Sequence, residues 1–236
     1  MKLGIIGAMS VEVETLKAQM CDLNITQKAG MEFYDGILEG VPAVVVVCGV
    51  GKVNAALCVQ ILCDCYQVTH LVNTGVAGAL SLELDISDLV VGKDAVYHDF
   101  DCHVLNDNYL VGQVPGMPVR EFPADKKLVE MAFSAAETVH KGHVHIGRVA
   151  SGDQFICSGE QKNEIVANTG ALCTEMEGAA IAHAAWRNGV PFVIIRAISD
   201  KADNSAEMDF PTFEAIAARH CAAVTMTLAR LFKEQL

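Results

Sequence analysis

Short apolar runs that suit β-strands alternate with segments of helical spacing along the whole chain. The pattern predicts strands at 2–6, 43–48, 70–73, 89–91, 146–150 and 192–198. It predicts helices at 10–20, 52–65, 124–139, 177–188 and 211–236. Unbroken alternation of this kind indicates an α/β fold, in which helices cover both faces of a mostly parallel sheet. We expect residues 1–236 to form one domain.

Particular residue types mark several of the expected helix ends. Ser10 is the expected N-cap of the first helix, which carries an acidic residue in its first turn. Ser158 and Gln161 form a capping box, so another helix begins there. Gly189 would end the 177–188 helix, and Pro211 would start the 211–236 helix.

The charge balance narrows the class of ligand. The chain has 17 Lys and Arg against 29 Asp and Glu, and a formal net charge of −12. Nucleic-acid binding needs clustered cations, so no nucleic-acid partner is expected, and a neutral or zwitterionic small molecule is favoured. The longest stretch without charged residues, 65–82, contains Gln67, His70 and Asn73, so no membrane span is expected.

The cysteines and the first residues indicate a cytoplasmic protein. The nine cysteines are odd in number and lie mostly in apolar surroundings, as buried reduced thiols do. No Cys-x-x-Cys pair occurs, so a zinc ribbon is not expected. The apolar segment 1–9 is short and acidic residues follow it at once, unlike an export signal.

Carboxylates and glycine-rich turns follow the expected strands, at the edge of the sheet where ligands bind in such folds. The carboxylates are Glu12, Glu175, Glu177 and Asp200. Each alone has a plain structural explanation, as a helix terminus, a solvated side chain or a cap. Together, partly desolvated carboxylates have separated pKa values, so that one can serve as an acid and another as a base.

Three further patterns suggest other chemistry less strongly. The 49–52 turn, Gly-x-Gly-Lys, matches no phosphate-loop spacing, so a tight turn is expected. The 98–103 segment, His-Asp-Phe-Asp-Cys-His, carries metal-ligating side chains but suits a polar loop. His143 and His145 would face one side of a strand and could chelate a metal. No third ligand is near them in the sequence, so a structural role is expected.

Seven motifs in order carry a family resemblance. They are Gly-Ile-Ile-Gly-Ala-Met at 4–9 with Glu12, Gly-Val-Gly-Lys-Val at 49–53, Asn-Thr-Gly-Val-Ala-Gly at 73–78, Tyr-His-Asp-x-Asp at 97–101, Ser-Gly-Asp-Gln-Phe-Ile at 151–156, Glu-Met-Glu at 175–177 and Arg-Ala-Ile-Ser-Asp at 196–200. In this order the chain resembles the 5′-methylthioadenosine/S-adenosylhomocysteine nucleosidases. The resemblance implies a nucleoside phosphorylase-like fold, a three-layer αβα domain with a mixed, mostly parallel central sheet.

The resemblance implies hydrolysis of the adenine–ribose bond of 5′-methylthioadenosine and S-adenosylhomocysteine, with 5′-deoxyadenosine as a further substrate. Adenine leaves more easily when its N7 is protonated, and water must be held at the anomeric carbon. By similarity Asp200 is the acid, Ser199 orients it, and Glu12 activates the water, as paired carboxylates do in glycoside hydrolysis. Neither a cofactor nor a metal is implied.

The same resemblance assigns binding roles. Glu177 would accept the ribose hydroxyls with Met176 packed on the ribose, and Glu175 and Arg196 would complete the polar network around the water. Phe155 would stack on adenine. The other expected substrate contacts are Ala8, Met9, Val50, Val76, Gly78, Ile156 and Phe210.

Departures from the family pattern leave alternatives open. The 102–109 segment differs from the family and is about two residues longer, and Val76 stands where a serine is common. In the family this segment lines the pocket for the 5′-substituent, so the preferred 5′-group is open. Pro115, which follows it, is expected near the partner's site in a homodimer.

Three other functions remain possible at this point. A hydrolase of the same fold could act on another nucleoside, such as aminofutalosine. A phosphate-dependent nucleoside phosphorylase is disfavoured, because the Glu12 carboxylate would repel phosphate. A nucleoside-binding protein without catalysis is disfavoured by the presence of both Glu12 and Asp200.

Overall fold

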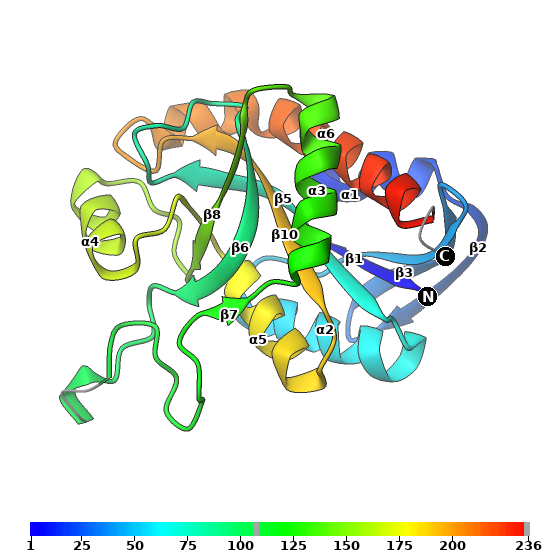
Figure 1. Ribbon diagram of the computed structural model, residues 1–236, viewed down its shortest axis with the longest axis horizontal. Coiled ribbons are helices and arrows are strands. Elements are labelled where there is room, and N and C mark those ends of the chain that lie inside the picture. Colours follow the sequence, from blue (N-terminus) through cyan, green and yellow to red (C-terminus); the bar gives the residue numbers. More distant parts are fainter. Residues whose placement is uncertain (106–108, 234–236) are drawn as a thin grey trace.

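Figure 1 shows the computed structural model of the chain, which describes residues 1–105 and 109–233. The strands are β1 (Leu3–Gly7), β2 (Cys21–Lys28), β3 (Met31–Leu38), β4 (Val41–Val47), β5 (His70–Ala79), β6 (Leu89–Tyr97), β7 (Phe122–Pro123), β8 (Val144–Ser151), β9 (Cys173–Glu175) and β10 (Phe192–Asp200). The helices are α1 (Ser10–Ala18), α2 (Lys52–Tyr66), the short η1 (His103–Leu105), α3 (Lys126–Val139), α4 (Gly159–Thr169), α5 (Gly178–Asn188) and α6 (Ala206–Lys233). Every predicted strand and helix is present.

One mixed sheet contains all these strands, in the order β10-β6-β8-β9-β5-β1-β4-β3-β2, with β7 beside β6. β5 also pairs with β10, so β5, β10, β6, β8 and β9 close into a ring. Parallel pairing joins β1 to β4 and β5, and β10 to β5. Antiparallel pairs, such as β10 with β6 and the β2–β3–β4 edge, are more frequent than the sequence predicts.

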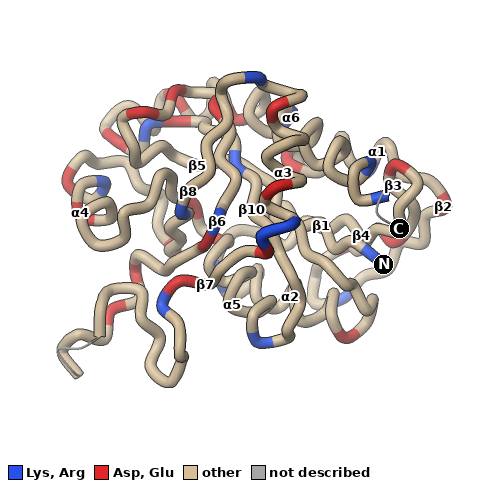
Figure 2. Tube along the Cα trace, in the orientation of Figure 1, with Lys and Arg blue, Asp and Glu red and all other residues tan. Residues whose placement is uncertain are grey.

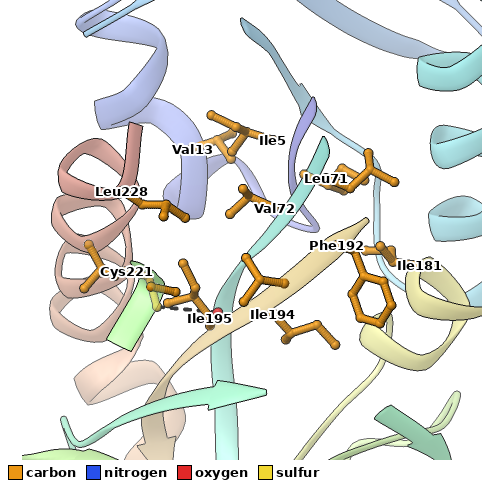
Figure 3. Packing of buried hydrophobic residues seen from close by; sticks show 14 of the residues in the cluster. Ile5, Val13, Leu71, Val72, Ile181, Phe192, Ile194, Ile195, Cys221 and Leu228 are labelled. Carbon is orange, nitrogen blue, oxygen red and sulfur yellow. Dashed lines mark hydrogen bonds between the residues drawn. The ribbon is translucent and has the colours of Figure 1, made fainter. Parts of the chain in front are cut away.

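Helices cover both faces of the sheet, as expected for a three-layer fold. α1 and α3 pack against α6 on one face, and α2 packs against α5 on the other (Figure 1). The core lies between these layers. In Figure 3, Val72 and Ile195 point toward Cys221 and Leu228 of α6, on the same side of the sheet. Burial of each such aliphatic side chain contributes about 1.5–3 kcal/mol to folding.

The neighbouring residues of the same strands face the opposite layer. Leu71 and Ile194 lie on the side of Phe192 and of Ile181 in α5 (Figure 3). These residues are almost completely buried. β5 and β10 therefore bury apolar side chains on both faces of the sheet.

Two of the residues expected to mark a helix start do not do so. The N-cap of α1 is Met9 rather than Ser10, because the Glu12 carboxylate accepts the Met9 amide and so takes the capping role. The last helix begins at Ala206, with Pro211 inside it. The helix begins early because the backbone carbonyl of Ser205 accepts the amides of Met208 at 2.9 Å and Asp209 at 3.0 Å. The predicted residues 234–236 lie outside the described residues.

Four strands were not predicted: β2, β3, β7 and β9. β2 is an edge strand whose side chains are mostly exposed, so it lacks an apolar run. β7 and β9 contain only two and three residues. Among the described helices, none is both long and apolar enough to cross a membrane.

Charged residues are spread along the described chain. On the Cα trace, positions of Lys and Arg lie scattered among those of the more numerous Asp and Glu (Figure 2).

Candidate active site

A cavity of about 250 Å³ lies where β1, β5 and β10 end, beside β9. The residues that line it are Ala8, Met9, Glu12, Val50, Val76, Ala77, Gly78, Gln154, Phe155, Ile156, Thr174, Glu175, Met176, Glu177, Ser199, Asp200 and Phe210. These include every residue predicted for catalysis and substrate binding. Arg196, predicted for the water network, lies behind the cavity wall.

Glu12 is held at the cavity by backbone amides from two elements. It lies in the first turn of α1, where its Oε2 accepts the amides of Ala8 at 2.7 Å and Met9 at 2.9 Å. Its Oε1 accepts the amide of Val76 in β5 at 3.0 Å. Burial raises the pKa of the Glu12 carboxyl, while nearby Arg196 and the three amides act in the opposite direction. A buried carboxylate with these donors is suited to take a proton.

Asp200 occupies the end of β10 and is also buried. Its Oδ2 accepts the Ser199 hydroxyl at 2.9 Å, and its Oδ1 accepts the Ala202 amide at 2.8 Å. Burial raises the pKa of the Asp200 carboxyl, and the hydrogen bonds from Ala202 and Ser199 oppose this. A carboxyl in such a site tends to keep its proton and can act as an acid.

Two glycines in β5 leave the room that these carboxylates occupy. A Cβ at Gly75 would clash with Glu12 Oε1, and one at Gly78 would lie 2.7 Å from Asp200 Oδ1. A side chain at either position would therefore displace the neighbouring carboxylate, and glycine permits the close approach. The 73–78 motif thus leaves space beside β5 for a carboxylate from α1 and another from the end of β10.

Arg196 forms a buried ion pair with Glu175 and also donates to Asn73. Glu175 also accepts the Ser151 hydroxyl and, at 2.7 Å, the Gly178 amide at the start of α5. Burial disfavours the charge on Arg196, but Glu175 and Glu12 together raise its pKa. The guanidinium therefore supplies a fixed positive charge behind the carboxylates.

Glu177 links the cavity to the glycine-rich turn at 49–52. Its Oε1 accepts the Gly51 amide at 2.7 Å. Burial, with Glu175 as a like-charged neighbour, raises the pKa of Glu177 to about 8. Lys52, the next residue in this turn, donates its amide to Asp153 at 2.8 Å. The 49–52 turn thus donates backbone amides to two carboxylates.

The mouth of the cavity is apolar and partly open. The rings of Phe155 and Phe210 meet edge to face, with their centroids 5.5 Å apart. Phe155 is 45% exposed and Val50 is 48% exposed, although both line the cavity. Aromatic faces of this kind bind flat heterocycles by stacking.

Ala77, Gln154 and Thr174 line the cavity but were not among the predicted site residues. Ala77 and Gln154 fall inside the quoted motifs, so the motif positions could have identified them. Thr174 lies in the short strand β9, for which the sequence gives no signal. Asn73, which fixes Arg196, also lies in a quoted motif.

Comparisons with known proteins agree with this geometry. A family model described as the phosphorylase superfamily matches residues 2–230. A 5′-methylthioadenosine/S-adenosylhomocysteine nucleosidase of Geobacillus kaustophilus strain HTA426 is 39% identical over 236 residues, which is 100% of this chain and 99% of that protein. The chain belongs to the 5′-methylthioadenosine/S-adenosylhomocysteine nucleosidase family.

Solved structures of this nucleosidase family share the fold. The Neisseria meningitidis nucleosidase, in complex with methylthio-immucillin-A, superposes with a TM-score of 0.93 at 35% identity and covers 98% of this chain and 99% of its own. A futalosine hydrolase of Helicobacter pylori superposes with a TM-score of 0.91 at 30% identity, covering 100% of this chain and 98% of its own. The nucleoside phosphorylase-like fold expected from the sequence is confirmed.

Proposed function

We propose that this chain hydrolyses the adenine–ribose bond of 5′-methylthioadenosine and S-adenosylhomocysteine, and acts on 5′-deoxyadenosine by the same route. One observation carries the proposal. Two buried carboxyls, Glu12 and Asp200, reach the same cavity from different elements, and an aromatic pair stands at its mouth. The cavity thus offers an acid, a base and a surface for a flat base.

Asp200 acts on the purine. As the bond from the anomeric carbon to N9 breaks, its electron pair moves into adenine, and Asp200 gives its proton to N7. The Ser199 hydroxyl fixes the carboxyl through Oδ2. Protonation makes adenine a better leaving group, and such general acids contribute about 10²–10⁴-fold to the rate.

Glu12 acts on the water. The ribose left behind has oxocarbenium character, and water attacks its anomeric carbon while one proton passes to Glu12. The ion-paired Arg196 behind it favours the ionised carboxylate before the attack. Adenine leaves with the former Asp200 proton on N7, and the 5-thioribose product leaves with the new hydroxyl. The proton on Glu12 then passes through solvent to Asp200, which restores both carboxyls.

Glu177 and Met176 are assigned to the ribose. Glu177 has one oxygen bound to the Gly51 amide, and its other oxygen is available to the paired ribose hydroxyls. Met176 lines the cavity beside it, where its sulfur packs on the sugar. Phe155 stacks on adenine, with the Ile156 backbone at the purine edge, and Phe210 covers the 5′-alkylthio group.

The lining favours water over phosphate as the nucleophile. Among the residues lining the cavity in the described part of the chain, four are carboxylic acids and none is lysine, arginine or histidine. The one arginine close by, Arg196, is neutralised by Glu175. A phosphate ion would meet negative charge without a free cation, so phosphorolysis is disfavoured.

A second candidate function is hydrolysis of aminofutalosine. The close superposition on a futalosine hydrolase favours it, as does the altered 102–109 segment. Residues 106–108 of this segment lie outside the described residues. A larger 5′-substituent would enter the cavity on the Phe210 side.

We also propose that the enzyme is a cytoplasmic homodimer of single-domain subunits. One sheet runs through the whole described chain, which supports a single domain, and all nine cysteines are free. Pro115 is exposed on a loop that extends away from the body of the molecule (Figure 1). In the dimer this loop reaches the partner's open cavity mouth. Light scattering at working concentration tests the assembly, and a monomer mass would refute it.

The decisive experiment is adenine release from 5′-methylthioadenosine by the purified protein in phosphate-free buffer. Prompt release without phosphate is the expected result. Release only when phosphate is added, with a ribose 1-phosphate product, would establish a phosphorylase instead. Parallel assays with S-adenosylhomocysteine, 5′-deoxyadenosine and aminofutalosine rank the 5′-substituents, and a strong preference for aminofutalosine would select the second candidate.

A further inference from the structure

A group of histidines surrounds one aspartate on the α3–α6 side of the sheet, outside the active-site cavity. Asp88 directly precedes β6, and its side chain is 5% exposed. His143 Nδ1 lies 2.9 Å from Asp88 Oδ1, and His145 Nε2 lies 3.4 Å from Asp88 Oδ2. One carboxylate thus contacts both histidines of the pair that the sequence singled out.

The fold brings further imidazoles to the same place. His140, the C-cap of α3, stacks on His143 with ring centroids 4.5 Å apart. The ring of His220 in α6 lies 5.2 Å from that of His140, and its buried Nδ1 has no hydrogen-bond partner among the described residues. Ligand atoms of Asp88, His140 and His143 all lie within 4.8 Å of one another.

We propose that Asp88, His140 and His143 form a binding site for a divalent transition-metal ion such as Zn²⁺, with the imidazoles of His145 and His220 beside it. Imidazole nitrogen with one carboxylate oxygen is a donor set that suits Zn²⁺, Co²⁺ and Ni²⁺ rather than Mg²⁺ or Ca²⁺. This site is separate from the proposed hydrolysis, for which no metal is implied.

The surroundings suit a metal site in two respects. Asp88 Oδ2 accepts the Asp85 amide at 2.9 Å, so the carboxylate is oriented by a bond outside the ligand set. His143 is 57% exposed at its side chain, which leaves the cluster open to an ion from solvent.

A metal ion bound at this site would connect three separate segments of the chain. Its ligands come from the loop before β6, the end of α3 and the loop before β8. The backbone of Asp88 also accepts the amide of Ile198 in β10 at 2.9 Å. An ion that binds only the folded protein raises the thermal midpoint with concentration, by mass action.

The test is calorimetric titration of the full-length, metal-free protein with Zn²⁺, together with the absorption spectrum of its Co²⁺ form. Three proteins are compared: the wild type, His143→Ala, and the control His103→Ala, which removes an exposed histidine elsewhere. We expect the wild type and His103→Ala to bind one Zn²⁺ equally and to gain thermal midpoint. We expect His143→Ala to bind at least about tenfold more weakly, as for the loss of a ligand or its support.

Equal Zn²⁺ affinity in all three proteins would overturn the site, as would the absence of binding in the wild type. Thiolate charge-transfer bands in the Co²⁺ spectrum would place the ion on cysteine and would also overturn it. His140→Gln serves as a second ligand variant if His143→Ala unfolds at a lower temperature without metal. None of these outcomes depends on nucleosidase activity.

Discussion

The two carboxyls of the proposed active site are both buried, but the charged groups around them differ in sign. Around Glu12, Arg196 and the amides of Ala8, Met9 and Val76 all stabilise the ionised form. Around Asp200, the Ala202 amide and Ser199 do so, while the like charges of Asp203 and Asp209 oppose ionisation. The difference supports the proposed assignment of Glu12 as the base and Asp200 as the acid.

The strongest test of this comparison removes the acid. Asp200→Asn keeps the size of the side chain but has no proton to give to N7. We expect the turnover number to fall by about 10²–10⁴-fold, the usual contribution of a general acid. Steady-state adenine release measures it, with Asp64→Asn, an exposed position in α2, as the control. An unchanged turnover number in Asp200→Asn would remove the assigned acid.

The corresponding change at the proposed base is Glu12→Gln. It cannot take the proton from water, so a loss of at least about 10²-fold in turnover is expected. Both oxygens of Glu12 accept backbone amides, so the NH₂ group of the glutamine would face one of these donors. The lost hydrogen bond costs about 1–3 kcal/mol of folding stability.

Thermal unfolding should therefore separate Glu12→Gln from Asp200→Asn. Glu14→Gln, exposed on the same helix, is the control for both readouts. Normal hydrolysis by Glu12→Gln would show that Glu12 does not activate the water.

A third change displaces the base without removing it. The Cβ of Gly75→Ala would push against Glu12 Oε1. A displacement of about 1 Å costs on the order of 10²-fold in rate, so turnover should fall while most of the protein stays folded. Gly159→Ala, where a Cβ meets nothing within 4 Å, is the matched control. Equal turnover in the two variants would mean that the position of Glu12 is not critical.

The smallest effect concerns the pH profile. The Ser199 hydroxyl favours ionised Asp200, so Ser199→Ala should raise the pKa of Asp200 further. Activity requires protonated Asp200 and is lost as the pH rises through this pKa. The alkaline limb of the turnover profile should therefore move to higher pH in Ser199→Ala, by up to about one unit, while the acid limb set by Glu12 stays in place. A shift to lower pH would contradict the proposed hydrogen-bond effect.

The sequence predicts which carboxylates meet in the cavity better than it predicts the residues that hold them in place. Glu12 and Asp200 each follow an apolar strand, and strand ends meet at one edge of an α/β sheet, so their convergence could be expected. The close contact between Gly75 and Glu12 could not be predicted from the sequence, because it depends on how α1 packs against β5. β2 was missed because its exposed side chains give no apolar run.

Long-range neighbours explain the remaining differences. The expectation that no third ligand lies near His143 and His145 in the sequence overlooks His140, which precedes His143 by only three residues. Asp88, by contrast, reaches the group only through the packing of the loop before β6. The last helix begins before Pro211 because the backbone carbonyl of Ser205 accepts its first amide hydrogen bonds, from Met208 and Asp209. Local propensity does not contain these contacts.

The ring of strands around β5 has a consequence for how the protein is made. β5 ends at Ala79, but its partner β10 begins only at Phe192, so the ring cannot close until most of the chain has been synthesised. Contacts between such distant segments form slowly in folding. A nascent chain that stops before Phe192 leaves one edge of β5 unpaired, which makes it a target for aggregation or for chaperones.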